Sequence, residues 1–146
     1  MSYQHILVPV DGSDTSITAI EHAAQLAQKI GAKITAIQVL VLDPYIASEY
    51  LSAGQTNELI ERARNYIQKN LDSVKEKFKE LGVDVDTKLV EGQLVHREII
   101  KATEELNADL VVMGSHGHTG LKKLFLGSVA QNVLTEIHLP VLIARA

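Results

Sequence analysis

Apolar runs alternate with helical periodicity along the whole chain. Five short segments are rich in apolar and β-branched residues, which is typical of strands in a buried sheet. Four longer segments place apolar residues three or four positions apart, which is typical of amphipathic helices. The predicted strands are 5–10, 33–41, 83–90, 109–114 and 141–145. The predicted helices carry their apolar stripes over 17–30, 59–81, 95–106 and 129–137.

The order of these segments defines the fold class. Strands and helices alternate strictly, which indicates a parallel sheet that helices cover on both faces. Segment 83–90 alternates apolar and polar residues, as a half-exposed edge strand does. No linker or internal repeat divides the chain. We therefore expect one doubly wound, Rossmann-like α/β domain over residues 1–146, with a five-stranded parallel sheet in the order 3-2-1-4-5 and four helices.

Composition narrows the classes of function. The chain has no cysteine, which excludes disulfides, thiolate metal sites and a cysteine nucleophile. Its formal net charge of −4 argues against nucleic acid or an anionic membrane as the main partner. The amino-terminal residues lack the pattern of a signal peptide, and no apolar run is long enough to span a bilayer. The expectation is a soluble, cytoplasmic protein.

Two loops of unusual composition follow strands that should be neighbours. An open α/β sheet binds ligands beyond the carboxyl ends of its strands, at the point where the strand order reverses. In the expected order this point lies between the first and fourth strands. Those strands end in "VPVDGS" (8–13) and "VVMGSHG" (111–117). We therefore expect the two loops to meet in one crevice.

The glycine-rich loop after the fourth strand has the chemistry of a phosphate site. Gly114 and Gly117 lack a Cβ atom, so their backbone N–H groups can lie close to an anionic group. Gly127 and Ser128 stand at the expected start of the last helix, where unbonded N–H groups and the helix dipole favour phosphate. The structural alternatives are turn chemistry for the glycines and a capping box between Ser128 and Gln131.

The loop after the first strand suits a nucleoside. The carboxylate of Asp11 suits a ribose hydroxyl, an adenine amino group or a magnesium ion. Followed by Gly12, it is also a common turn pair. The residues expected to form apolar walls for a flat base are Pro9, Val10, Val41 and Met113.

Motifs of nucleotide-processing enzymes are absent from the sequence. There is no G-x-S-x-G elbow, no G-x-x-x-x-G-K-[ST] loop, and no G-x-G-x-x-G after the first strand. His116 and His118 stand two positions apart without a third ligand nearby, which supports a metal site poorly. We expect a binding protein without catalytic residues.

The segment 114–128, "GSHGHTGLKKLFLGS", fits the pattern G-x2-G-x9-G-[ST]. This pattern is the nucleotide-binding signature of the universal stress protein family, which the chain resembles in this segment. "ILVPVDGS" (6–13) and "PVLIAR" (140–145) also resemble the first and last strands of that family. The resemblance implies that the chain binds ATP with a divalent cation, Mg2+, and forms a homodimer. The residues expected to bind ATP are Pro9, Val10, Asp11, Val41, Met113, Gly114, His116, Gly117, Gly127, Ser128 and Val129.

Three functions stay open at this point. The first is an ATP-binding stress-response or regulatory protein that acts on an unidentified client. The second is an adenylating enzyme of the ATP pyrophosphatase type, although "DGSDTS" (11–16) matches its S-G-G-x-D-S loop only in part. The third is a dimeric scaffold that binds no nucleotide. The expected homodimer contact is the last strand, Val141–Arg145, an apolar segment at the edge of the sheet.

Overall fold

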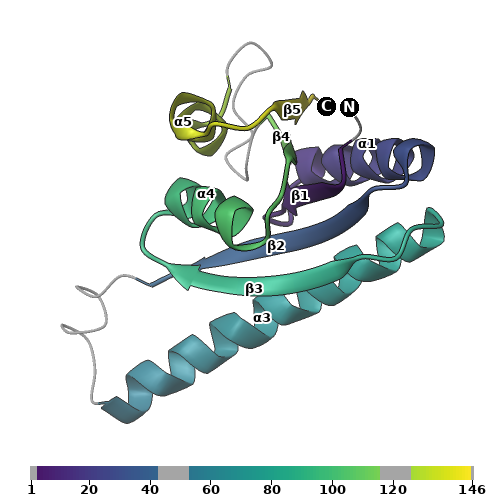
Figure 1. Ribbon diagram of the computed structural model, residues 1–146. Helices are drawn as coiled ribbons and strands as arrows, with labels where there is room; N and C mark the ends of the chain where they lie inside the picture. Colours follow the sequence, from purple (N-terminus) through teal and green to yellow (C-terminus); the bar gives the residue numbers. More distant parts are fainter. Residues whose placement is uncertain (1–2, 43–52, 116–125, 146) are drawn as a thin grey trace.

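The computed structural model describes residues 3–42, 53–115 and 126–145 of the chain. The strands are β1 (His5–Pro9), β2 (Lys33–Val41), β3 (Asp86–Gly92), β4 (Leu110–Gly114) and β5 (Val141–Ala144). The helices in the described residues are α1 (Asp14–Ile30), α3 (Ala53–Glu80), α4 (Val95–Glu105) and α5 (Ser128–Glu136). These elements confirm the predicted alternation of strands and helices (Figure 1).

The five strands form one parallel sheet in the order β3-β2-β1-β4-β5. This confirms both the predicted order and the predicted edge positions of β3 and β5. The strand order reverses between β1 and β4, which pair through Ile6 with Leu110 and Leu7 with Val111. Pro9 and Met113 lie beyond these paired residues, at the carboxyl end of the two strands. The loops that follow β1 and β4 therefore leave the sheet at its switch point.

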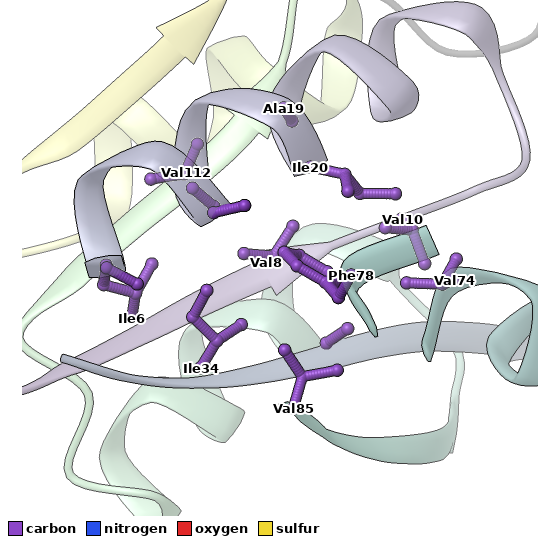
Figure 2. Close-up of a cluster of buried hydrophobic side chains, with 14 of the residues drawn as sticks. Ile6, Val8, Val10, Ala19, Ile20, Ile34, Val74, Phe78, Val85 and Val112 are labelled. Carbon is purple, nitrogen blue, oxygen red and sulfur yellow. The ribbon is translucent and has the colours of Figure 1, made fainter. Parts of the chain in front are cut away.

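Successive residues of the central strands face two separate cores, as the pleat of a strand requires. Ile6 and Val8 pack with apolar residues of α1 and α3 on one face of the sheet. Figure 2 shows this core, in which Phe78 of α3 is fully buried against β1. Leu7 faces the other way and packs with residues of α4 and α5. Each pair of helices thus covers one face of the sheet.

Local sequence signals define the ends of α1. Ser13 is the N-cap residue, and its side chain accepts a hydrogen bond from the backbone N–H of Ser16. Gly31 follows the helix with φ +72°, a left-handed conformation that favours glycine. Both residue types are the ones that these helix ends favour. The apolar stripe is less accurate at its flanks, because Ile17 is 45% exposed instead of buried in the core.

In the described part of the chain, every helix is too short or too polar to span a membrane.

Candidate functional site at the ends of β1 and β4

A cavity of about 270 Å3 opens at the carboxyl ends of β1 and β4, where the sequence places the crevice. Its walls come from these two strand ends and from the first turns of α1, α4 and α5. This volume is close to the lower end of the range of about 300–1,000 Å3 typical of small-molecule sites. The predicted residues that line it are Pro9, Val10, Asp11, Met113, Gly114, Gly127, Ser128 and Val129.

Helix α4 contributes a wall that the sequence did not indicate. Val95 and Ile99, one helical turn apart, both line the cavity. Their spacing marks them as part of the apolar stripe, and Ile99 is buried in the core below. A stripe predicts which side of a helix is covered but not which loops its first turn approaches. The other lining residues that the sequence did not indicate are Ser16, Ser115 and Ala130.

Val41 does not line the cavity, although the sequence suggested a wall for a flat base. It is the last residue of β2, paired with Gly92 of β3, and its side chain is 48% exposed. The cavity lies at the junction of β1 with β4, on the other side of β1 from β2. His116 and Gly117 lie outside the described residues, so their proposed contacts stay predictions.

Gly114 is required by packing between α1 and β4. A Cβ atom at this position would lie 2.6 Å from Oγ1 and 2.8 Å from Cβ of Thr15, and 2.9 Å from the backbone carbon of Thr15. Thr15 is buried in the first turn of α1. The absence of a side chain at Gly114 thus allows α1 to approach β4. Close approach of a phosphate, the reason that the sequence offered, stays a prediction, and among the described residues the neighbour that needs the space is Thr15.

Gly127, and not Ser128, is the residue that caps α5. Gly127 is the N-cap residue of α5, and its backbone N–H donates to the carbonyl of Ser115 at 2.7 Å. This N–H is therefore not available to a phosphate. Ser128 is the first helical residue and not the N-cap, so the capping box that the sequence left open as an alternative is not formed. Glycine is one of the residues favoured at the N-cap, where the backbone is extended.

The N–H groups that α5 offers to a ligand are those of Ser128, Val129 and Ala130. The N–H of the next residue, Gln131, already donates to the carbonyl of Gly127 at 3.0 Å. The three preceding N–H groups have no intrahelical acceptor, because a helix leaves its first donors unbonded. All three residues line the cavity. The helix dipole adds partial positive charge at the same place.

Asp11 also lines the cavity and is held by bonds within its own loop and to the first turn of α1. Its Oδ1 atom accepts hydrogen bonds from the backbone N–H of Ser13 at 2.9 Å and from the hydroxyl of Ser16 at 2.8 Å. The hydroxyl of Ser16 in turn accepts from the backbone N–H of Asp11 at 3.2 Å. These bonds fix the position of the one charged side chain among the described lining residues.

A metal site built from the protein alone is not assembled in residues 3–42, 53–115 and 126–145, where no three His, Cys, Asp or Glu side chains converge. Asp11 is the one carboxylate that faces the cavity. A divalent cation at this place would therefore need most of its ligands from elsewhere, such as the oxygens of a bound phosphate chain.

The model of the universal stress protein family matches residues 2–145. The chain belongs to this family. Universal stress protein MJ0531 of Methanocaldococcus jannaschii is 39% identical over 144 residues, an alignment that covers 98% of this chain and 82% of the relative. These findings confirm the resemblance drawn from the glycine pattern and from the first and last strands.

Solved structures of the family share the architecture of this universal stress protein. The structure of MJ0577 from the same archaeon superposes with a TM-score of 0.84 at 29% identity, over 100% of this chain and 98% of that chain. A universal stress protein in complex with cAMP superposes with a TM-score of 0.71 at 25% identity, over 99% and 98% of the two chains. The second structure shows that a relative binds an adenine nucleotide.

Proposed function

We propose that the cavity at the ends of β1 and β4 binds ATP together with Mg2+. The observation that carries this proposal is that the described lining combines apolar side chains, the carboxylate of Asp11 and the open N-terminus of α5. A nucleotide has the same three parts: a flat base, a sugar with hydroxyl donors, and an anionic phosphate chain. The relative in complex with cAMP supports the same class of ligand.

The base belongs in the apolar slot. Val10 and Met113 come from the sheet side, and Val95 and Ile99 come from α4. Removing a flat ring from water between such side chains is favourable, at about 25 cal/mol for each Å2 of apolar surface buried. Adenine is also the base of the nucleotide bound to the relative.

The sugar and the phosphates are then placed by charge. Asp11 accepts hydrogen bonds and repels anions, so the ribose hydroxyls belong on its side of the cavity. The phosphates belong at the N–H groups of Ser128, Val129 and Ala130, where backbone donors and the helix dipole both favour negative charge. Mg2+ would be held through the phosphate oxygens and would neutralise part of the negative charge of the triphosphate.

We infer that binding regulates the protein instead of preparing the nucleotide for reaction. Among the lining residues that the structure describes there is one carboxylate and no histidine, lysine or arginine. General acid–base catalysis of phosphoryl or adenylyl transfer relies on such groups close to the reacting atoms. The output is then a change in the contacts of a client protein or of a second copy.

For a second copy, we propose that β5 is the contact. Val141–Ala144 is an edge strand, and Val141, Leu142 and Ile143 are only half-buried in the single chain. An exposed apolar edge favours pairing with a symmetry-related strand. Light scattering at micromolar concentration should give twice the chain mass, and a monomeric mass would contradict the contact.

The nucleotide proposal is tested on the purified full chain. Mass spectrometry of the small molecules released by denaturation should detect ATP, and calorimetry of the emptied protein with ATP and Mg2+ should give one site per chain. Titration with GTP is the matched control for the base. An absence of heat with ATP, together with no released nucleotide, would contradict the proposal and favour the dimeric scaffold. Pyrophosphate release in the presence of acceptor compounds would favour the adenylating enzyme.

A further inference from the structure

A second cavity, of about 250 Å3, lies between α1 and α3 on the opposite face of the sheet from α4 and α5. Its base is apolar, since Val10, Ile20 and Val74 lie together there (Figure 2). Ile17 lines the same cavity and is exposed. An exposed isoleucine beside an apolar hollow is surface that a ligand would cover.

Among its described lining residues, the second cavity has a single charged side chain, that of Lys77 of α3, and no carboxylate. Lys77 is half-buried, and its ammonium group forms no ion pair with any residue that the structure describes. A partly buried cation without a partner attracts an anion more strongly than a fully solvated one, because water screens it less.

A helix-stabilising effect of Lys77 is the simpler explanation and can be separated. Lys77 and Lys79 both lie in the last turn of α3, where a cation interacts favourably with the helix dipole. Lys79 is exposed and does not line the cavity. The two lysines therefore share the effect on the helix and differ only in their position relative to the cavity.

Polar side chains in the walls of the second cavity form hydrogen bonds with neighbouring protein groups. Ser13 and Ser16 are buried, and their hydroxyls serve the cap of α1 and the carboxylate of Asp11. The amide nitrogen of Asn70 donates to Gln38 of β2. These bonds fix the walls before any ligand arrives, which lowers the entropic cost of binding. They also leave Lys77 as the group that selects the ligand.

We propose that the second cavity binds an organic monocarboxylate with an apolar body. The carboxylate pairs with the ammonium of Lys77, and the body covers Ile17 and fills the hollow over Val10, Ile20 and Val74. The volume corresponds to about eight water molecules at about 30 Å3 each, which is the size of a medium-chain aliphatic acid. The proposal is independent of any nucleotide, since it rests on a different set of contacts.

The test uses octanoate as the probe on the full-length chain. Amide resonances of a 15N-labelled sample, recorded during titration, should shift at Ile17, Val74 and Lys77 and saturate as one site. Octylammonium and octan-1-ol have the same apolar chain with the opposite charge or none. Both should bind more weakly than octanoate by about tenfold, the range for one charge-assisted hydrogen bond.

Two matched variants locate the charge that recognises octanoate. Lys77→Met keeps the apolar stem and removes the ammonium, and it should weaken octanoate binding by about fivefold, since the site is partly open to solvent. Lys79→Met removes the same charge from the same helical turn and should leave the affinity unchanged. Equal binding of octanoate and octan-1-ol, equal effects of the two variants, or shifts confined to other residues would each overturn the proposal.

Discussion

The two cavities lie on opposite sides of the loop between β1 and α1, and two residues, Val10 and Ser16, line both of them. The first cavity is formed by strand ends and helix N-termini, and its donors are backbone N–H groups. The second is formed mostly by the sides of α1 and α3, together with Val10, Gly12 and Ser13 of the segment before α1. Among the described residues its one charged group is the side chain of Lys77, so we expect an anion to be bound by backbone donors in the first cavity and by an ammonium group in the second.

This difference follows from the architecture. A parallel sheet places every strand end and the start of every following helix at the same edge, so unbonded donors gather there. The groove between α1 and α3 collects apolar side chains instead, because both helices turn their apolar stripes toward the sheet. A charge enters such a groove only through a long side chain at its rim, as with Lys77.

The largest expected effect comes from Gly114, which packs against Thr15 of α1. The next residue of that helix, Ser16, lines both cavities. Gly114→Ala places a Cβ against Thr15 and should lower the free energy of unfolding by about 2 kcal/mol, as overpacking does. Urea unfolding measures this loss. Gly31→Ala is the control, because a Cβ there meets nothing within 4 Å and only the left-handed backbone is strained, at a cost of about 1 kcal/mol.

The same pair of variants tests how the two cavities depend on α1. A shift of Thr15 displaces its neighbour Ser16, so Gly114→Ala should weaken both ATP and octanoate, whereas Gly31→Ala should affect neither. An unfolding free energy equal to that of the unmodified chain would show that Thr15 can move away without cost, and the packing explanation of Gly114 would be wrong.

The next effect should be confined to the first cavity. Ser128→Pro removes one backbone donor at the start of α5 and keeps the helix, since proline is favoured as the first helical residue. The preceding Gly127 already has the extended backbone that a residue before proline requires, with φ −65° and ψ 161°. The affinity for ATP should fall about tenfold, because a hydrogen bond to a charged group contributes about 1.5–3 kcal/mol.

Ser128→Ala is the matched control for that variant, because it removes the hydroxyl and keeps the backbone N–H. It should reduce ATP affinity less than Ser128→Pro does, and neither variant should change the affinity for octanoate. Calorimetry with each ligand gives the four values. Equal losses of ATP affinity in the two variants would assign phosphate binding to the hydroxyl of Ser128 instead of the helix backbone.

The fold was predictable because its signals are local and repeated. The apolar run before Asp11, the caps at Ser13 and Gly31, and the alternation of strands and helices are all visible in the sequence. The meeting of the loops after β1 and β4 followed from the strand order. The family was likewise evident from the spacing of Gly114, Gly117 and Gly127.

The details of the candidate site were less predictable because they depend on how helices and loops from distant parts of the chain pack together. Val95 looks like any other residue of an apolar stripe, and only the path of α4 brings it to the cavity. Position 114 packs against Thr15, and this neighbour lies 99 positions earlier in the chain. The sequence also did not indicate that Gly127, and not Ser128, would be the N-cap residue of α5.

The smallest expected effect is a coupling between the cavities through Ser16. Its hydroxyl holds the carboxylate of Asp11 at the first cavity, and the residue also lines the second. Both ligands should favour this arrangement of the loop, so saturating octanoate should raise the affinity for ATP by about threefold. ATP should raise the affinity for octanoate by the same factor, because coupling between two sites is reciprocal.

Ser16→Ala removes the hydrogen bond and should abolish the coupling while each ligand still binds. Calorimetric titration of ATP with and without octanoate, in both proteins, measures it. If the affinity for ATP is the same with and without octanoate, the loop is a rigid wall between two independent sites, and the shared position of Ser16 has no regulatory consequence.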